Sequence, residues 1–360
     1  MPRPPLVDPK LGINARAAKL LDGRRDLAKL PKAHLHLHFT GSLDVQTLIR
    51  LADAAHQSLP DQLTDAEAFS APATTKGWFR FQRAYDIARH VVAGEAAMRT
   101  VVDTAARLDA ADGSRRLEIQ IDPTSYAPAV GGIINALDIV LDEAVRASQR
   151  HGVQVGVIVA ASRMRHPIEA RTLARLAARN VGNEPGSVVG FGLSNDEWAG
   201  DTPAWEGAFR IARNAGLPGV PHGGELRGPD HIRTVVAMLR PTRLGHGIRA
   251  AEDPKLVDDL VKAGITLEIC PSSNVHLGVY PSLADVPLRQ LVAAGATVAL
   301  GADDPLLFLT RLNDQYVIAR QLGFTDDELA DLARSSLRAS FATDADKAKW
   351  LAEVDDWLLT

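Results

Sequence analysis

PKAHLHLH, at residues 31–38, alternates histidine with aliphatic residues. Because successive side chains of a β-strand point to opposite faces, this alternation predicts a strand with His34, His36 and His38 on one face. Two imidazoles on neighbouring inward positions of a strand can bind a divalent metal ion. A half-buried strand whose polar face is rich in histidine is the alternative, and the segment by itself favours neither.

The strand is the first of a regular series. Further β-branched or apolar runs lie at residues 116–121, 153–159, 188–193, 219–222, 242–246, 265–269 and 297–301. Helical patterns lie between them at residues 133–149, 168–178, 204–214, 229–239 and 254–263. Eight strands that alternate with helices predict an α/β protein, a closed (β/α)8 TIM barrel, with an open doubly wound sheet as the alternative.

The connections suggest how the chain is organised around this barrel. We expect residues 1–360 to form a single domain, with a poorly ordered Pro-rich segment at 1–12 and a short helix at 14–28. The connection between residues 42 and 113 is too long for one helix, so we expect a helical insertion over the barrel mouth. Its aromatic segment at 77–85 favours core packing of an extra helix, or a hydrophobic lid over a planar ligand. After the last strand we expect helices to the C-terminus.

The composition limits the classes of function. Hydrophobic residues make up 46% and charged residues 23% of the chain, and the formal net charge is −4. Without a basic patch we expect no nucleic-acid partner, and a small molecule is the expected ligand. Cys270 is the single cysteine, so an intrachain disulfide is excluded. No signal peptide or membrane-spanning stretch is evident, so we expect a cytoplasmic protein with no membrane partner. The oligomeric state does not follow from the sequence.

Chemically active side chains follow several predicted strands at the point where each strand ends. His222 and Glu225 follow the fifth strand, His246 ends the sixth, and Asp303 and Asp304 follow the eighth. Each has an ordinary structural explanation as a turn, cap or surface residue. In a barrel, however, these ends form one rim, where active sites of this fold lie. Imidazoles and a carboxylate together suit zinc, so the joint pattern favours a metal site with the histidines of the first strand.

Five segments, spread in order over nearly the whole chain, carry a resemblance to a known family. They are Pro31–His38, His222–Glu225, Leu244–Gly247, Cys270–Asn274 and Asp303–Pro305. With these segments the chain resembles the adenosine deaminase family of metal-dependent amidohydrolases. The resemblance implies zinc-dependent hydrolytic deamination of adenosine or 2'-deoxyadenosine to inosine and ammonia, as part of purine metabolism. A 6-aminopurine nucleoside is then the expected small-molecule partner.

The resemblance also implies a role for each matching residue. One Zn²⁺ ion per chain would be bound by His36, His38, His222 and Asp303. Glu225 matches the residue that protonates purine N1, and His246 matches the residue that orients the attacking hydroxide. The expected substrate-binding residues are His38, Thr40, Asn195 and Asp304, of which Asp304 matches the residue that bonds purine N7.

Three positions depart from the family pattern. Thr40 stands where an acidic residue is usual, Asn195 where a glycine is usual, and His34 where an acidic residue is usual. We expect His34 to be a core residue or to support the metal ligands. Thr40 leaves open a deaminase of free adenine or of a 5'-modified adenosine. Two other classes also remain open: a nucleoside-binding or signalling protein with vestigial activity, and a hydrolase of amides or phosphoesters.

Overall fold

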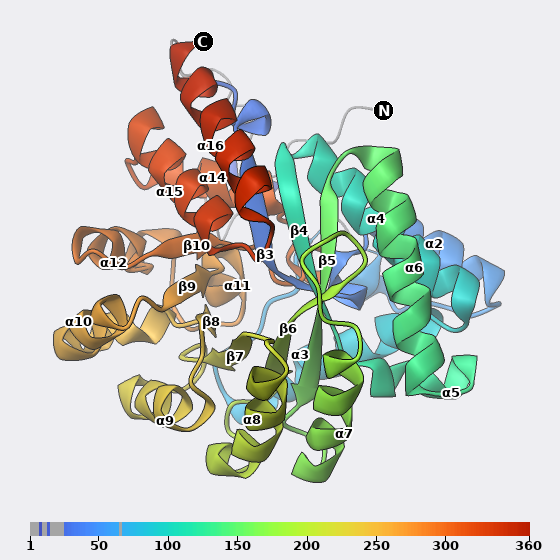
Figure 1. Cartoon of the computed structure of the whole chain (residues 1–360). Helices are drawn as coiled ribbons and strands as arrows, with labels where there is room; N and C mark the ends of the chain where they lie inside the picture. Colours follow the sequence, from blue (N-terminus) through green and yellow to red (C-terminus); the bar gives the residue numbers. More distant parts are fainter. Residues whose placement is uncertain (1–6, 9–12, 15–24, 65–66) are drawn as a thin grey trace.

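A computed structural model describes residues 7–8, 13–14, 25–64 and 67–360 of the chain. Its central feature is a sheet of eight parallel strands that follow one another in chain order (Figure 1). The strands are β3 (Lys32–His38), β4 (Ser114–Ile121), β5 (Gln154–Ser162), β6 (Val188–Ser194), β7 (Gly219–Gly223), β8 (Arg243–His246), β9 (Thr266–Ile269) and β10 (Val298–Leu300). Each begins and ends within two or three residues of its predicted position.

The sheet closes into a barrel between its last and first strands. Leu37 of β3 pairs in parallel with Asp303, which follows β10. The Asp303 amide donates to the carbonyl of His36 at 3.1 Å, and the amide of His38 donates to the carbonyl of Asp303, also at 3.1 Å. The predicted closed (β/α)8 barrel is therefore confirmed, and the open-sheet alternative is wrong.

Helices surround the barrel (Figure 1). They include α6 (Ile133–His151), α7 (Pro167–Ala178), α8 (Glu206–Asn214), α9 (Pro229–Leu239), α10 (Pro254–Lys262), α11 (Pro271–His276) and α12 (Leu288–Ala293). Proline occupies the first helical position of α7, α9 and α10, where its missing N–H has no partner to lose. All five helices predicted from periodicity are present, with shifts of at most two residues at their ends. None of the described helices is long and apolar enough to span a membrane.

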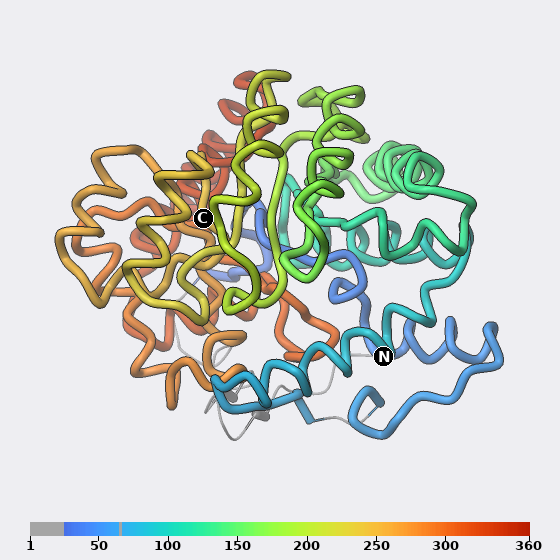
Figure 2. The backbone as a smooth tube through the Cα atoms, turned by 90° about the horizontal axis from the view of Figure 1, so that it is seen from below, coloured from blue at the N-terminus to red at the C-terminus, as the bar shows by residue number. Residues whose placement is uncertain are grey.

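Extra helices lie where the sequence predicts them. The connection between β3 and β4 contains α2 (Val45–Ala54), α3 (Thr75–Val91) and α4 (Glu95–Ala111). Figure 2 shows this blue-to-cyan connection spread along one side of the molecule. After β10 the chain continues as α13 (Pro305–Phe308), α14 (Leu312–Gln321), α15 (Asp326–Ala339) and α16 (Asp344–Leu359). Because buried apolar side chains from all these parts form one main cluster, we propose that the chain is one domain.

The two predictions for the N-terminal segment lie mostly outside the described residues. Of the segment expected to be poorly ordered, only 7–8 belong to the described chain, and they pair with 13–14 as a short antiparallel ladder. The helix expected at 14–28 falls largely on residues that the structure does not describe. At the end of this predicted helix the described chain instead forms a 3-10 turn, η1 (Leu27–Lys29).

The first strand contains an irregularity that its sequence does not reveal. The pairing of β3 with β4 shifts register between His34 and Leu37. His34 is buried and its Nδ1 lies 2.9 Å from Asp109 Oδ1 on α4, while its Nε2 accepts from the Ala302 amide at 3.1 Å. The prediction that His34 shares a face with His36 and His38 is therefore wrong, because the irregularity interrupts the alternation. His34 is a core residue.

Candidate active site

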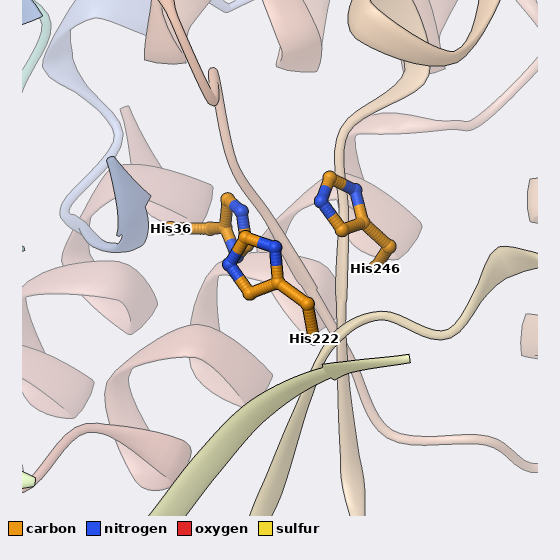
Figure 3. Close-up of side chains that lie close together, drawn as sticks. All are labelled: His36, His222 and His246. Atoms are coloured by element: carbon orange, nitrogen blue, oxygen red, sulfur yellow. The ribbon is translucent and has the colours of Figure 1, made fainter. Parts of the chain in front are cut away.

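Five side chains with metal-binding chemistry converge at the mouth of the barrel. They are His36 and His38 of β3, His222 of β7, His246 at the end of β8, and Asp303 after β10. Asp303 Oδ1 lies 3.1 Å from His38 Nε2 and 3.4 Å from His36 Nε2. The ring centre of His36 lies 4.8 Å from that of His222 and 4.5 Å from that of His246. Figure 3 shows these three imidazoles directed toward one another from separate segments of the barrel.

The donor set fits a divalent metal ion. His36 and His222 are buried, and their Nε2 atoms have no hydrogen-bond partner within the described part of the chain. Burial, followed by the neighbouring imidazoles, lowers the pKa of His222 well below its ordinary value. It is therefore held neutral, the form in which imidazole binds metals. Buried polar atoms without partners require an explanation, and a metal ion accounts for these two.

Two further side chains, Glu268 and Ser273, contact the atoms of His36 and Asp303 that do not face the cluster. Glu268 of β9 has Oε2 2.8 Å from His36 Nδ1, which leaves Nε2 of His36 directed to the cluster. Ser273 donates from Oγ to Asp303 Oδ2 at 2.7 Å, which leaves Oδ1 facing the imidazoles. Such partners fix the orientation of metal-binding groups and raise their affinity.

Glu268 belongs to a buried charged network inside the barrel. Its Oε1 accepts from Arg243 Nε at 2.7 Å, and Arg243 Nη2 forms an ion pair with Glu118 Oε2, also at 2.7 Å. Glu118 also accepts from Arg116 Nε at 3.1 Å. Burial raises the pKa of Glu118, but the two guanidinium groups offset this and hold it below its ordinary value. The charged groups of this network are paired with one another, and the network extends from the barrel interior to His36.

Two carboxyl groups beside the metal-binding cluster, those of Glu225 and Asp304, have raised pKa values. Burial, with Asp303 nearby, raises the pKa of Glu225 well above its ordinary value. The same two causes raise the pKa of Asp304, whose Oδ1 has no hydrogen-bond partner in the described chain. Glu225 Oε2 lies 3.6 Å from His246 Nε2. Burial, followed by His36, lowers the pKa of His246 to about 3, so this imidazole is neutral.

A cavity of about 650 Å³ opens above these groups. Its walls include His38, His222, Glu225, His246, Asp303 and Asp304, and also Asn195, Gln120, Tyr126, Trp78 and Phe79. The size is typical of small-molecule sites. Trp78 and Phe79 come from α3, so the aromatic segment both packs in the core and forms part of the cavity wall.

Asn195 and Thr40, two predicted substrate contacts that depart from the family pattern, differ in whether they line the cavity. Asn195 lines the cavity with a φ of 78°, a left-handed conformation that asparagine tolerates better than most residues. Thr40 is fully buried, is not part of the cavity wall, and has Oγ1 2.7 Å from the hydroxyl oxygen of Tyr126. Tyr126 therefore stands between Thr40 and the cavity, and Thr40 supports the wall instead of facing a ligand.

Sequence reasoning missed Glu268 and Gln120. Gln120 of β4 pairs in register with His38, is only 2% exposed and lines the cavity, yet neither of its amide atoms has a partner in the described chain. A signal for both was present. In Arg116-Leu-Glu-Ile-Gln120 polar residues alternate with aliphatic ones, and Glu268 is a lone charge in an apolar run. Inside a barrel such residues face inward.

Comparisons with known proteins show that the chain is similar to adenosine and adenine deaminases. The sequence model of the family described as "Adenosine deaminase" matches residues 31–357. The chain is 54% identical over 340 residues to a protein of Streptomyces virginiae named "Putative adenosine/adenine deaminase", covering 94% of this chain and 99% of that one. It is 30% identical to an adenine deaminase of Agrobacterium fabrum, covering 91% and 98%. The crystal structure of an adenine deaminase from Arthrobacter aurescens superposes with a TM-score of 0.82 at 29% identity, covering 92% and 100%.

Proposed function

The chain belongs to the adenosine deaminase family of metal-dependent amidohydrolases, and we propose that it hydrolyses the 6-amino group of adenosine or 2'-deoxyadenosine. The products would be the corresponding inosine and ammonia. The observation that carries this proposal is the cavity itself, which is lined by four members of the metal-binding cluster (His38, His222, His246 and Asp303) together with Glu225 and Asp304. A protein that only binds nucleosides has no need of this buried acid beside a metal-binding cluster.

We assign one zinc ion to His36, His38, His222 and Asp303. When bound, such an ion lowers the pKa of water to about 7 and so supplies hydroxide at neutral pH. His246 is assigned to the reaction and not to the ion, since its Nε2 faces Glu225 at 3.6 Å. As a neutral imidazole it can accept a hydrogen bond from the attacking water and hold that water in place.

Glu225 supplies the proton that the purine needs. C6 of an aminopurine is a poor electrophile, and protonation of N1 withdraws electron density from C6, so that C6 is open to attack by water. A buried carboxyl group with a raised pKa can hold that proton at neutral pH. Asp304, also buried with a raised pKa, can donate to N7 on the opposite edge of the ring. The backbone amide of Asn195 is assigned to the N3 edge.

Free adenine is the second candidate substrate. The relatives in Agrobacterium fabrum and Arthrobacter aurescens are both named adenine deaminases. A 5'-modified adenosine is a further option within the same chemistry. Both alternatives share the proposed catalytic residues and differ only in what fills the cavity beyond the base. A cytoplasmic location stays a prediction.

Ammonia release from the zinc-loaded protein tests the proposal. The substrates are adenosine, 2'-deoxyadenosine, adenine, 5'-substituted adenosines and AMP, and the change in ultraviolet absorbance is followed in parallel. We expect the highest kcat/KM with adenosine or 2'-deoxyadenosine. A preference for adenine would retain the mechanism and replace the substrate. Loss of ammonia release with every compound would overturn the proposal in favour of a binding protein.

Two variants test the assigned roles. Asp303→Ala should lose zinc and activity together, because it removes a ligand. Glu225→Gln should keep zinc, measured by elemental analysis, and lose most of kcat, because the amide cannot give up a proton. If Glu225→Gln kept both its zinc and nearly full turnover, the proton donor would have to be another group.

A further inference from the structure

We propose that Glu197 and Arg163 are positioning residues that jointly fix the segment from His222 to Glu225. This inference rests on the proposed function, because it concerns the segment that carries a metal ligand and the proton donor. Neither residue touches the substrate cavity: both lie behind its wall. Together they hold the two ends of the segment.

Glu197 binds the end that carries the proton donor. Its side chain is fully buried in the loop after β6. Its Oε1 accepts from the Glu225 amide at 3.1 Å, and its Oε2 accepts from the amides of Leu226 and Arg227 at 2.9 and 2.7 Å. Both oxygens thus act as acceptors for three consecutive backbone N–H groups. Hydrogen bonds to an ionised acceptor are the strong ones, so this turn is tightly held.

Arg163 binds the end that carries the metal ligand. It follows β5 and is only 3% exposed. Its Nη2 donates to the carbonyl of His222 at 3.2 Å, and its Nη1 donates to Thr202 Oγ1 at 3.0 Å. The Arg163 guanidinium lies 5.8 Å from the ring centre of Trp205. Burial lowers the pKa of Arg163, and the negative charge of Glu197 partly offsets this effect. A buried carboxylate and a buried guanidinium of opposite charge therefore act on one segment.

The segment benefits from this support because its middle is a pair of glycines, which cost more conformational entropy to order than other residues. Gly223 and Gly224 separate the two functional residues, and Gly224 has a φ of +83°. A Cβ at Gly224 would lie 2.5 Å from Ile232 Cδ1, so a stiffer residue cannot replace it. Glycine loses more conformational freedom on ordering than any other residue. The contacts of Glu197, from the loop after β6, and of Arg163, from the segment after β5, supply the rigidity that the Gly-Gly pair lacks.

The same carboxylate connects two walls of the cavity. Glu197 comes two residues after Asn195, which lines the cavity next to the position assigned to purine N3. A ligand that binds at Asn195 therefore acts on a loop that is hydrogen-bonded to the Glu225 turn. We infer that this connection sets the distance between the N3 side of the base and the carboxyl group at N1.

Glu197→Gln is the first test, because it keeps the shape but turns one acceptor oxygen into an N–H donor that faces backbone N–H groups. On the zinc-loaded protein we expect kcat to fall by about 10²-fold, the scale of an ångström-sized misplacement, while KM changes by less than about threefold. Zinc content should equal that of the wild type. Glu143→Gln is the matched control, since Glu143 is also a buried carboxylate but pairs with Arg99 and Arg150 on the outer helices.

Two readouts separate positioning from general destabilisation. If Glu197 acts through Glu225, Glu197→Gln should cost less than about threefold in kcat when introduced into Glu225→Gln. Hydrogen exchange of the peptide covering residues 222–228 should be faster in Glu197→Gln and unchanged in Glu143→Gln. Arg163→Met should accelerate exchange in the same peptide.

The outcomes also separate this inference from the proposed function. Unchanged exchange in the 222–228 peptide, or full multiplication of the two losses in the double variant, would overturn the positioning role even in an active enzyme. Absence of ammonia release from the wild type would instead overturn the proposed function. Faster exchange would still support the structural part of the inference in that case.

Discussion

Gly41 permits the position of Asp304, and its replacement by alanine is the most direct test of the site geometry. Gly41 lies in the buried turn after β3. A Cβ built on Gly41 would lie 1.8 Å from Asp304 Oδ1, 2.7 Å from its Cγ and 2.9 Å from its Cβ. Ordinary contact needs about 3.5 Å, so Oδ1 would have to retreat by about 1.7 Å. Because three atoms of Asp304 are too close, rotation of its carboxyl group alone cannot relieve the overlap.

The expected effect on catalysis follows from that displacement. A misplacement of about 1 Å can cost about 10²-fold in rate, so Gly41→Ala should lower kcat/KM with the best 6-aminopurine by at least this factor. That loss equals about 2.7 kcal/mol of transition-state stabilisation. Overpacking itself should destabilise the fold by about 1–3 kcal/mol, visible as a lower melting temperature, while the zinc content stays at the wild-type value.

A double-variant cycle checks the cause. Asp304→Ala removes the two closest of the three overlapping atoms, so adding Gly41→Ala to it should cost less than about threefold. Gly190→Ala serves as the control, since the nearest atom to its Cβ would belong to Phe341, at 3.3 Å, followed by Ile158 and Pro218 at 3.5 Å, none of which is a site residue. If Gly41→Ala kept a near-normal kcat/KM while Asp304→Ala lost most of it, the reasoning would be refuted: a side chain at position 41 would then not displace the Asp304 carboxyl group.

Three other predictions concern the charged groups around the barrel. Glu268→Gln should weaken zinc affinity by about 10–100-fold, measured by competition with a chelator, because the contact to His36 Nδ1 loses its charge; unchanged affinity would contradict it. Glu118→Gln should lower the free energy of unfolding by about 3–5 kcal/mol, measured with denaturant, because buried Arg243 loses an ionised partner; a loss below about 1 kcal/mol would count against the network. Asp326 has its pKa lowered, since hydrogen bonds and charges from Arg25 and Arg320 outweigh the effect of burial. The contribution of Asp326 to the free energy of unfolding is fully present above its unfolded-state pKa and is lost as the pH falls through its folded-state pKa. Asp326→Asn should therefore make the free energy of unfolding depend less on pH in this acid range.

The fold could be predicted because it depends on short-range patterns. Most barrel strands are short runs of mainly apolar residues, β3 and β4 alternate polar with aliphatic residues, and all are buried between the barrel interior and the helices. Alternation with amphipathic helices then leaves few topologies. The local irregularity at His34 could not be predicted, because a register shift is a property of two paired strands and the sequence of β3 shows only its own alternation.

The convergence of the histidines at the barrel mouth and Asp303 could be predicted from the sequence, but their individual contacts could not. Strand ends meet at one rim in any barrel, so His222, His246 and Asp303 are expected near one another from their positions alone. Which atoms face the cavity depends on the backbone after each strand. Thr40 illustrates the limit, since one turn of 3-10 helix places it behind Tyr126.

The backbone at the rim explains why the site and the closure of the barrel depend on each other. Six of the described residues other than glycine have a positive φ, and three of them, Asn195, His246 and Asp303, line the cavity. Such conformations cost free energy and persist only where surrounding contacts enforce them. For Asp303 those contacts are its two backbone hydrogen bonds to β3, the same bonds that join the last strand to the first. A substitution that loosens the closure should therefore misplace the Asp303 carboxylate before it unfolds the barrel.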